Sequence, residues 1–379
     1  MNSHFIGMMS GTSLDAVDGV LVAFDVAGGS SQLLKRASIN LPKLLKEQLT
    51  FLAHSETLTF RQLAVAEDGL TRLYADCALQ LLADLPKSQQ PLAMGCHGQT
   101  LEHQPNLVPS YTLQLLNPSL LAELTGKNVI ADFRRRDLAA GGQAAPLVPA
   151  FHNSVFRSAN KDRVIINLGG IANLTFLPAL LLSANPQQAV IGFDTGPANL
   201  LLDAWFQQHW QLPFDAKGKQ AASGQVIPAL LNTILANEYF ARKPPKSTGR
   251  ELFNPQQLSS WLASCSGSGE FAAKDVLRTL VEVTAVSLVD QIRMLDPKAI
   301  AEVFVCGGGW QNSFLRARII ELASPRPLAS TEALGIPPQD VEAAAFAWLA
   351  WRHYHNKSGN LPSVTGAKGE RVLGGFYPA

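Results

Sequence analysis

The sequence predicts an α/β protein of about two domains. Short apolar runs typical of buried strands alternate with longer segments whose apolar residues recur at helical spacing. A strand, glycine turn, strand pattern occurs twice, at residues 6–22 and again at 164–176. The 379 residues exceed what one ordinary core accommodates, so each pattern is expected to open one half of the molecule. A cleft between the two halves is the expected ligand site.

The individual elements follow from the period of the apolar residues. Buried strands are predicted at 92–96, 129–131, 164–168, 190–193 and 303–306, and helices at 119–125, 198–210, 226–237, 273–294 and 341–354. The segment 273–294 places Val276, Leu280, Val283, Val286 and Val289 on one stripe, which predicts a long helix with one buried face.

Composition and charge exclude several classes of protein. A hydrophobic content of 47% with 16% charged residues is typical of a folded chain without long disordered tails. The net charge is +1 with scattered lysines and arginines, so nothing resembles a nucleic-acid-binding stripe. No apolar run reaches the ~18 residues of a membrane span, and no signal-peptide pattern follows Met1. The four cysteines are widely separated, and we expect reduced thiols in the cytoplasm.

The common catalytic motifs are absent from the sequence. There is no G-x-x-x-x-G-K-[ST] loop, no dinucleotide fingerprint, no H-E-x-x-H and no G-x-S-x-G. His97 and His103 have no further ligands at zinc-site spacing. The chemistry must therefore lie in polar clusters that follow apolar strands.

The first such cluster is the turn within Gly7–Asp18. A Gly/Ser/Thr turn presents backbone N–H groups and hydroxyls to an anion, and Asp15 and Asp18 follow where a phosphate-bound cation would be met. An ordinary polar hairpin turn is the alternative interpretation.

Asp194 is the sharpest catalytic candidate. It ends a predicted buried strand within Gly192–Asn199 and precedes a Gly-Pro step and a helix, a placement suited to a general base. The alternative is that Asp194 caps the helix beginning near Pro197.

Two further clusters have residues suited to a polyhydroxylated ligand. Gly95–Thr100 contains His97, Gln99 and Thr100 at the end of a strand, and the alternative is a polar turn with an internally satisfied histidine. Asp132–Asp137 contains Arg134 and is either a substrate-facing loop or a solvated charge run.

Two clusters near the C-terminus have both a binding and a structural interpretation. Cys306–Gly309, followed by Asn312, has glycines that would let a planar ring or a ribose approach the backbone, whereas a tight turn needs one glycine rather than three. Glu342 begins a predicted helix and is either an ordinary first-turn acid or a group that reaches the cleft.

Taken together, these clusters resemble the anhydro-N-acetylmuramic acid kinase family. The resemblance rests on segments that follow one another along the chain: Gly7–Asp18, Gly95–Thr100, 132–149, 167–175, Gly192–Asn199, 246–251, 305–312 and 361–366. It implies two ribonuclease-H-like domains flanking an ATP cleft, as in sugar kinases, actin and the Hsp70 ATPase. The expected domains are 1–136 with 356–379, and 137–355.

The resemblance also implies roles for individual residues. The expected first phosphate loop is Gly11, Thr12, Ser13, Leu14, Asp15, Ala16, Val17 and Asp18, with Asp15 and Asp18 near Mg²⁺. The second phosphate loop is Asn167, Gly169, Gly170 and Asn173, and the adenosine segment is Gly307, Gly308, Gly309 and Asn312. Asp194 matches the catalytic base, and His97, Gln99, Thr100, Arg134 and Glu342 are candidate sugar contacts. Ala144 departs from the family pattern, in which glycine is expected there.

The implied reaction uses ATP and Mg²⁺ on a small sugar. Asp194 would deprotonate a water that opens the 1,6-anhydro ring of 1,6-anhydro-N-acetylmuramic acid, and O6 would take the γ-phosphoryl group. The family also implies a homodimer, peptidoglycan recycling in a bacterial cytoplasm, and no nucleic-acid or membrane partner. Competing hypotheses are an ordinary sugar kinase acting on a free hydroxyl, an actin- or chaperone-like ATPase, and an inactive sugar-binding relative.

Overall fold

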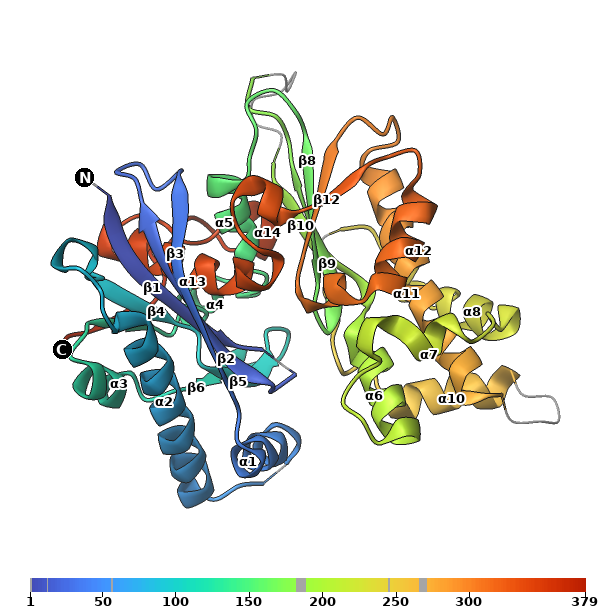
Figure 1. Ribbon diagram of the computed structural model, residues 1–379, viewed down its shortest axis with the longest axis horizontal. Coiled ribbons are helices and arrows are strands. Elements are labelled where there is room, and N and C mark those ends of the chain that lie inside the picture. The colour runs from blue at the N-terminus through green and yellow to red at the C-terminus, as the bar shows by residue number, and fades with distance from the viewer. Residues whose placement is uncertain (1, 12, 56, 182–188, 245, 266–270) are drawn as a thin grey trace. The chain divides into compact units, whose positions relative to one another are not determined.

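The computed structural model describes residues 2–11, 13–55, 57–181, 189–244, 246–265 and 271–379. The chain divides into two compact units, an N-terminal unit of Met1–Phe156 with Asp340–Ala379 and a C-terminal unit of Arg157–Gln339. Both units combine a sheet with helices, which confirms the predicted α/β class (Figure 1). No helix in these described ranges is long and apolar enough to cross a membrane.

The elements of the N-terminal unit alternate between strands and helices. The strands are β1 (Ser3–Ser10), β2 (Ala16–Phe24), β3 (Ser31–Asn40), β4 (Ala93–Cys96), β5 (Gln99–Gln104), β6 (Tyr111–Leu115), β7 (Val129–Ala131) and β13 (Gly375–Tyr377). The helices are α1 (Lys43–His54), α2 (Phe60–Leu82), α3 (Pro118–Thr125), α4 (Arg135–Ala139), α5 (Val148–Val155), α13 (Val341–Tyr354) and α14 (Pro362–Thr365).

The main sheet of this unit has the strand order β13-β7-β4-β1-β2-β3 over the described residues. The strands β1, β2 and β3 pair antiparallel, whereas β1–β4 and β4–β7 pair parallel. A separate β5–β6 ribbon follows β4. Because β1 and β4 run parallel, the turn after β1 and the loop after β4 lie at the same edge of the sheet.

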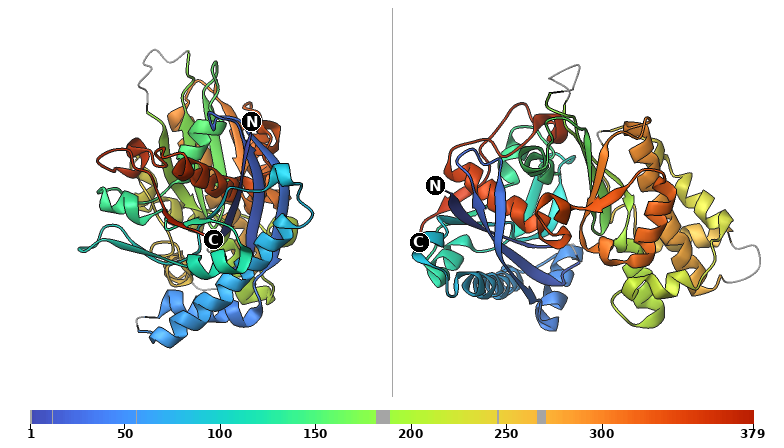
Figure 2. Two further views of the ribbon diagram at one scale, coloured as in Figure 1. Left: turned by 90° about the vertical axis from the view of Figure 1, so that its left-hand side faces the viewer. Right: turned by 45° about the horizontal axis from the view of Figure 1, so that its top comes forward.

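Helices cover both faces of this sheet (Figures 1 and 2). On one face, α13 lies so close that a Cβ at Gly7 would overlap the carbonyl of Ala343, and one at Gly95 would overlap that of Phe346. On the other face, a Cβ at Gly19 would lie 2.8 Å from the Cys77 sulfur of α2. The alanine-rich sequence of α13 and the strand glycines thus permit backbone-to-backbone packing.

The C-terminal unit has a second sheet with its own set of helices. Its strands are β8 (Arg163–Leu168), β9 (Ile171–Leu177), β10 (Ile191–Pro197), β11 (Glu302–Cys306) and β12 (Leu328–Ser330). Its helices are α6 (Asn199–Trp210), α7 (Lys219–Ala222), α8 (Pro228–Leu235), α9 (Glu238–Ala241), α10 (Pro255–Cys265), α11 (Ala273–Leu295) and α12 (Ser313–Ala323), and the 3₁₀ turn η3 covers Gly308–Gln311.

The second sheet repeats the topology of the first. Its order over the described residues is β10-β9-β8-β11-β12, with β8, β9 and β10 antiparallel and β8–β11–β12 parallel. When the strands of each sheet are numbered in chain order, both sheets read third, second, first, fourth, fifth, the ribonuclease-H-like order, and β13 adds a sixth strand at the edge of the first sheet. The predicted duplication of the strand, glycine turn, strand pattern is confirmed.

Helix α11 is the central helix of the C-terminal unit. It forms where predicted, but its burial extends well beyond one stripe: Thr279, Glu282, Thr284 and Ser287 are buried with the apolar residues. The reason is that α6, α7, α8, α12 and the sheet all pack against it, so α11 has neighbours around most of its circumference.

The unit boundaries differ from those expected from the sequence. Residues 137–156 and 340–355 belong to the N-terminal unit rather than to the second domain. The reason is that α13 packs on β1, β2 and β4, and α5 packs on α13. Composition shows no linker at either junction, so the sequence contained no signal for this grouping.

The glycine contacts of α13 yield a stability prediction. We expect Gly95→Ala to lower the melting temperature by roughly 5 °C or more, because the new methyl forces the helix away from β4. Gly29→Ala is the matched control, since its Cβ would have no neighbour nearer than 3.7 Å. Thermal unfolding followed by circular dichroism measures both, and equal melting temperatures would contradict the packing argument.

Candidate active site

One row of residues runs across the sheet of the C-terminal unit and gathers four predicted positions. Asp194 pairs with Asn173, Asn173 pairs with Asn167, and Asn167 pairs with Cys306. Directly opposite residues on neighbouring strands point to the same face of a sheet. We call Asp194, Asn173, Asn167 and Cys306 the strand row. Neighbouring members are about 5 Å apart, so Asp194 and Asn167 are separated by roughly 10 Å.

The β8–β9 turn joins the strands that contain Asn167 and Asn173, and it is held against helix α6. The carbonyl of Gly169 accepts a hydrogen bond from the N–H of Asn199 at 3.1 Å, and that of Gly170 accepts from Ala198 and Leu200. These contacts satisfy the first N–H groups of α6, which has no side-chain cap. The start of α6 is therefore occupied by the protein itself, and the turn is fixed in place.

The three glycines after β11 have different structural requirements. A Cβ at Gly307 would overlap the Asn167 side chain, and Gly307 has a φ of 86°. A Cβ at Gly309 would lie 2.8 Å from that of Leu168. Gly308 is exposed and has open space around it. Packing therefore explains two of the glycines, whereas Gly308 leaves room for an approaching ligand.

Asp194 lies at a bulge in β10 and is held by a neighbouring loop. Its N–H donates to the carbonyl of Lys246 at 3.1 Å, and its carboxylate Oδ2 accepts from the N–H of Thr248 at 2.9 Å. Its carbonyl accepts from the Tyr239 hydroxyl at 2.7 Å. The loop that contains Lys246 and Thr248 thus orients the Asp194 carboxyl from the side opposite β9.

The pKa of Asp194 is raised to about 7. Burial of the carboxyl is the main cause, the Thr248 N–H opposes it by stabilising the anion, and the negative charge of Glu251 adds to the rise. A carboxyl that titrates near neutral pH has the proton affinity suited to a general base. The capping alternative is wrong, because α6 begins at Asn199 with Ala198 as its N-cap and no side-chain cap bond.

Asn312, expected in the adenosine segment, has a structural role. Its side-chain oxygen accepts from the N–H of Leu315 at 3.1 Å, which makes it the N-cap of α12. Because this bond engages the amide oxygen, capping of α12 is a reason for an asparagine at position 312 that does not involve nucleotide binding.

The first phosphate loop forms the β1–β2 turn of the N-terminal unit. Leu14 has a φ of 56° and donates its N–H to the carbonyl of Gly11, and Ser13 is exposed. The expected member Thr12 lies outside the described residues. A Cβ at Gly11 would meet nothing nearer than 3.7 Å, so packing alone does not require glycine there.

Asp15 and Asp18 face different neighbours. Asp15 forms an exposed ion pair with Lys46 of α1 at 2.8 Å. Asp18 accepts a hydrogen bond from Ser38 at 2.7 Å and lies near Asp340, whose pKa is raised by burial and by the Asp18 charge. Asp15 precedes β2 whereas Asp18 lies within it, so the two carboxylates have different surroundings. Their role toward Mg²⁺ stays a prediction.

His97 and Arg134 form a buried pair in the N-terminal unit. The Arg134 Nε–H donates to His97 Nε2 at 2.9 Å, and His97 Nδ1 lies 2.8 Å from the Gly98 carbonyl. Because arginine is only a donor, His97 is neutral with its proton on Nδ1. Burial and the Arg134 charge hold the pKa of His97 well below its usual value. Arg135 and Arg136 are exposed, so Arg134 is the arginine of this charge run that turns inward.

The other candidate sugar contacts surround this pair. Glu342 lies in the first turn of α13. Burial lowers the pKa of Arg134 to about 10, and the negative charge of Glu342 partly opposes that shift. Gln99 is buried, and its side-chain carbonyl oxygen has no hydrogen-bond partner in the part of the chain that the structure describes. Thr100, beside it on β5, accepts from the Gln114 amide at 3.2 Å. These groups provide donors and acceptors for sugar hydroxyls.

Ala144 has the backbone conformation that favours the expected glycine. Its φ is 57°, its N–H donates to Asp137 Oδ2 at 2.8 Å, and its carbonyl accepts from Arg134 at 2.6 Å. The left-handed conformation costs a non-glycine residue about 1 kcal/mol. The two hydrogen bonds hold it, so the substitution keeps the backbone that positions Arg134.

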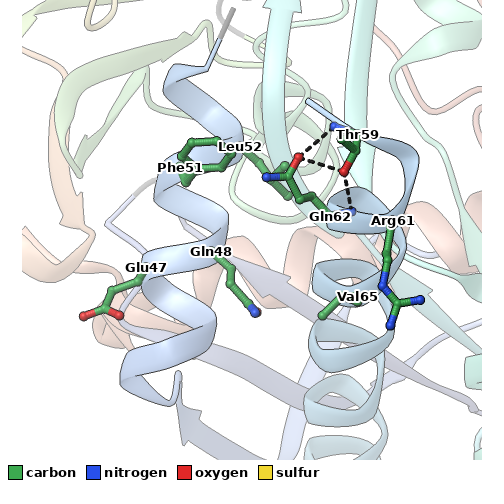
Figure 3. Close-up of a pocket in the computed structure, with 8 residues that line it drawn as sticks. All are labelled: Glu47, Gln48, Phe51, Leu52, Thr59, Arg61, Gln62 and Val65. Carbon is green, nitrogen blue, oxygen red and sulfur yellow. Dashed lines mark hydrogen bonds between the residues drawn. The ribbon is translucent and has the colours of Figure 1, made fainter. Parts of the chain in front are cut away.

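A pocket of about 520 Å³ lies elsewhere in the N-terminal unit, between α1 and α2 (Figure 3). It is lined by Glu47, Gln48, Phe51, Leu52, Thr59, Arg61, Gln62 and Val65. None of the predicted site residues contributes to it. Thr59 and Gln62 satisfy each other as the capping box of α2, so this pocket adds nothing to the candidate chemistry.

Three residues beside Asp194 were not predicted as site residues: Tyr239, Lys246 and Thr248. Lys246 is buried, donates to the carbonyls of Tyr239 and Phe240 at 3.3 Å, and lies 4.9 Å from the Tyr239 ring centre. The available signal was the Lys-Ser-Thr-Gly-Arg-Glu segment itself, which contributed to the resemblance without an assigned role.

The raised pKa of Asp194 yields a prediction on stability. A carboxyl whose pKa is about 7 when folded and near 3.8 when unfolded binds more protons in the folded state, so its contribution falls as pH rises from 4 to 7. Asp194→Asn should therefore raise the free energy of unfolding at pH 8 by about 1–3 kcal/mol, and by progressively less toward pH 4. Urea unfolding of both proteins at several pH values measures the difference. A pH-independent difference would contradict the shift.

Comparison with known proteins places the chain in a family. The family model described as anhydro-N-acetylmuramic acid kinase matches residues 3–379. The protein of that name from Variovorax paradoxus (strain S110) is 50% identical to this chain, and the alignment covers 99% of this chain and 99% of the relative. The one from Bordetella petrii is 48% identical, and the alignment covers 99% of this chain and 96% of the relative. Among solved structures, the activator of 2-hydroxyisocaproyl-CoA dehydratase from Clostridium difficile with bound ADPNP is 12% identical and covers 94% of this chain and 96% of its own, with a TM-score of 0.42. The chain belongs to the anhydro-N-acetylmuramic acid kinase family.

Proposed function

We propose that this protein is an ATP-dependent kinase that opens the 1,6-anhydro ring of 1,6-anhydro-N-acetylmuramic acid with water and phosphorylates O6. The products are N-acetylmuramic acid 6-phosphate and ADP. Family membership across residues 3–379 supports the substrate and the reaction. The observation that carries the mechanism is the Asp194 carboxyl, which is desolvated, oriented by Thr248 and poised near neutral pH.

Asp194 acts on water rather than on a sugar hydroxyl, because O6 of the anhydro sugar is already bonded to C1. The carboxylate takes one proton from water while the water oxygen bonds to C1 and the C1–O6 bond breaks. The O6 electron pair then bonds to the γ-phosphorus, and the bond to the ADP oxygen breaks. A general base of this kind contributes about 10²–10⁴-fold, and the remaining acceleration comes from positioning and charge stabilisation.

ATP is assigned to the glycine-containing turns of the two sheets. In the C-terminal unit Asn167 pairs with Cys306 and lies against Gly307, one residue before the open backbone of Gly308, and this supports contact with phosphate and nucleoside. In the N-terminal unit the turn that begins at Gly11 is the second proposed phosphate contact. Mg²⁺ usually keeps several waters and binds one or two carboxylates with the phosphates, and Asp18 fits that mode. When bound, the ion would neutralise phosphate charge.

The proposed sugar contacts are Arg134, Glu342, Gln99, Thr100 and His97. His97 holds the Arg134 guanidinium in one orientation, and two of the five N–H donors of Arg134 are used by His97 and Ala144. The unpartnered oxygen of Gln99 is an acceptor for a hydroxyl or amide proton of the sugar.

From the family alone we further propose a homodimer that acts in peptidoglycan recycling in the cytoplasm. Sedimentation equilibrium tests the dimer, since a single-chain mass would refute it.

The proposed reaction is tested by mass spectrometry after incubation with Mg-ATP and 1,6-anhydro-N-acetylmuramic acid in H₂¹⁸O. We expect a sugar phosphate with one ¹⁸O at C1, read promptly because ring opening exchanges the anomeric oxygen. A phosphorylated sugar without the label would favour an ordinary sugar kinase. ADP release without a phosphorylated sugar would favour an ATPase.

Asp194→Asn is the control for the mechanism in the same assay. It keeps an oxygen that can accept the Thr248 N–H but cannot take the proton, so we expect at least ~10² slower turnover with ATP binding unchanged. Wild-type turnover by this variant would remove Asp194 from the base role.

A further inference from the structure

Thr248 has a polar group that its contact with Asp194 does not use. Its backbone N–H donates to Asp194 Oδ2, whereas its side-chain Oγ1 is buried and has no hydrogen-bond partner among the described residues. Covalent geometry keeps Oγ1 roughly 3–4 Å from the backbone nitrogen of the same residue. Together with the N–H···Oδ2 bond of 2.9 Å, this keeps the unpartnered hydroxyl within about 7 Å of the carboxyl proposed as the base.

The surroundings of Thr248 are otherwise well bonded. The N–H and carbonyl of Asp194 are paired with Lys246 and Tyr239, and the Lys246 ammonium donates to two carbonyls. An unpaired buried hydroxyl costs about 1–3 kcal/mol, so most buried polar groups in proteins are paired. The unpaired Thr248 hydroxyl is thus available to a bound water or ligand near Asp194.

We propose that Thr248 is a positioning residue whose hydroxyl holds the water molecule that Asp194 deprotonates. The proposal rests on the proposed function. The water donates one proton to the Asp194 oxygen that Thr248 N–H leaves unused and its other proton to Thr248 Oγ1. With both O–H directions fixed, a lone pair of the water oxygen is left for C1. Orienting the nucleophile in this way lowers the entropic part of the barrier.

The chain has a matched control for a purely structural role. Thr331, also in the C-terminal unit, is fully buried, and its Oγ1 likewise has no partner among the described residues. It lies in the 3₁₀ turn after β12, outside the strand row and outside the loop that contains Lys246 and Thr248. Thr248→Val and Thr331→Val each remove a buried, unpartnered hydroxyl oxygen, so a difference in turnover between them depends on where the hydroxyl lies.

The test measures kcat, KM and melting temperature for Thr248→Val, Thr248→Ser, Thr331→Val and Asp194→Asn. We expect Thr248→Val to lower kcat about 10–100-fold, with KM for ATP within about two-fold and the melting temperature unchanged or higher. Thr248→Ser keeps the hydroxyl and should return kcat to within about three-fold of wild type. Thr331→Val should keep wild-type kcat. Adding Thr248→Val to Asp194→Asn should cause no further loss, because the base no longer uses the held water.

Several outcomes would overturn the proposal. A wild-type kcat for Thr248→Val would exclude a role for the hydroxyl. Equal losses in Thr248→Val and Thr248→Ser would assign the effect to packing, and so would a further full loss in the double variant. Failure of the proposed function is distinguishable, since it appears as wild-type turnover in Asp194→Asn or as no ¹⁸O-labelled sugar phosphate from the wild-type enzyme.

Discussion

The register of the C-terminal sheet is the constraint on which the candidate site depends. Pairing of β10 with β9, β9 with β8 and β8 with β11 puts Asp194, Asn173, Asn167 and Cys306 in one row. A shift of one residue in any of these pairings would turn the affected side chains to the other face. The parallel β8–β11 pair also brings the β8–β9 turn and the glycines after β11 to the same edge. The backbone therefore positions the proposed base and the proposed nucleotide contacts relative to one another.

The same arrangement makes the ionised Asp194 carboxyl unfavourable for the stability of the folded protein. The residue is half-buried, desolvation of its carboxyl raises the pKa, and the Thr248 N–H opposes that shift by stabilising the charged form. A surface aspartate would be ionised at neutral pH but too weak a base to take a proton from water efficiently. Burial strengthens the base and at the same time destabilises the folded state above pH 7. Stability and catalysis thus place opposite demands on this side chain.

The sequence predicted the parts that depend on local patterns. Each predicted strand and helix is present, because period and flanking glycines are local signals, and Asp194 was found because it directly follows a buried run. Contacts made by distant segments were not predictable. Thr248 reaches Asp194 only because a loop 54 residues later folds back onto β10. Asp15 and Asp18 were both expected near Mg²⁺, and their different partners, Lys46 and Ser38, lie in other segments of the chain. The φ of Ala144 depends on Asp137 and Arg134 and has no signature in the local sequence.

The central claim is that the fold gives Asp194 the pKa of a general base. The most direct test is ¹³C NMR titration of the protein labelled at aspartate carboxyl carbons, with Asp194→Asn used to assign the resonance. We predict that the Asp194 resonance titrates with an apparent pKa of about 7, well above the usual value of an aspartate side chain. Titration of Asp194 near 4 would contradict the account, because the carboxyl would then be an ordinary solvated acid.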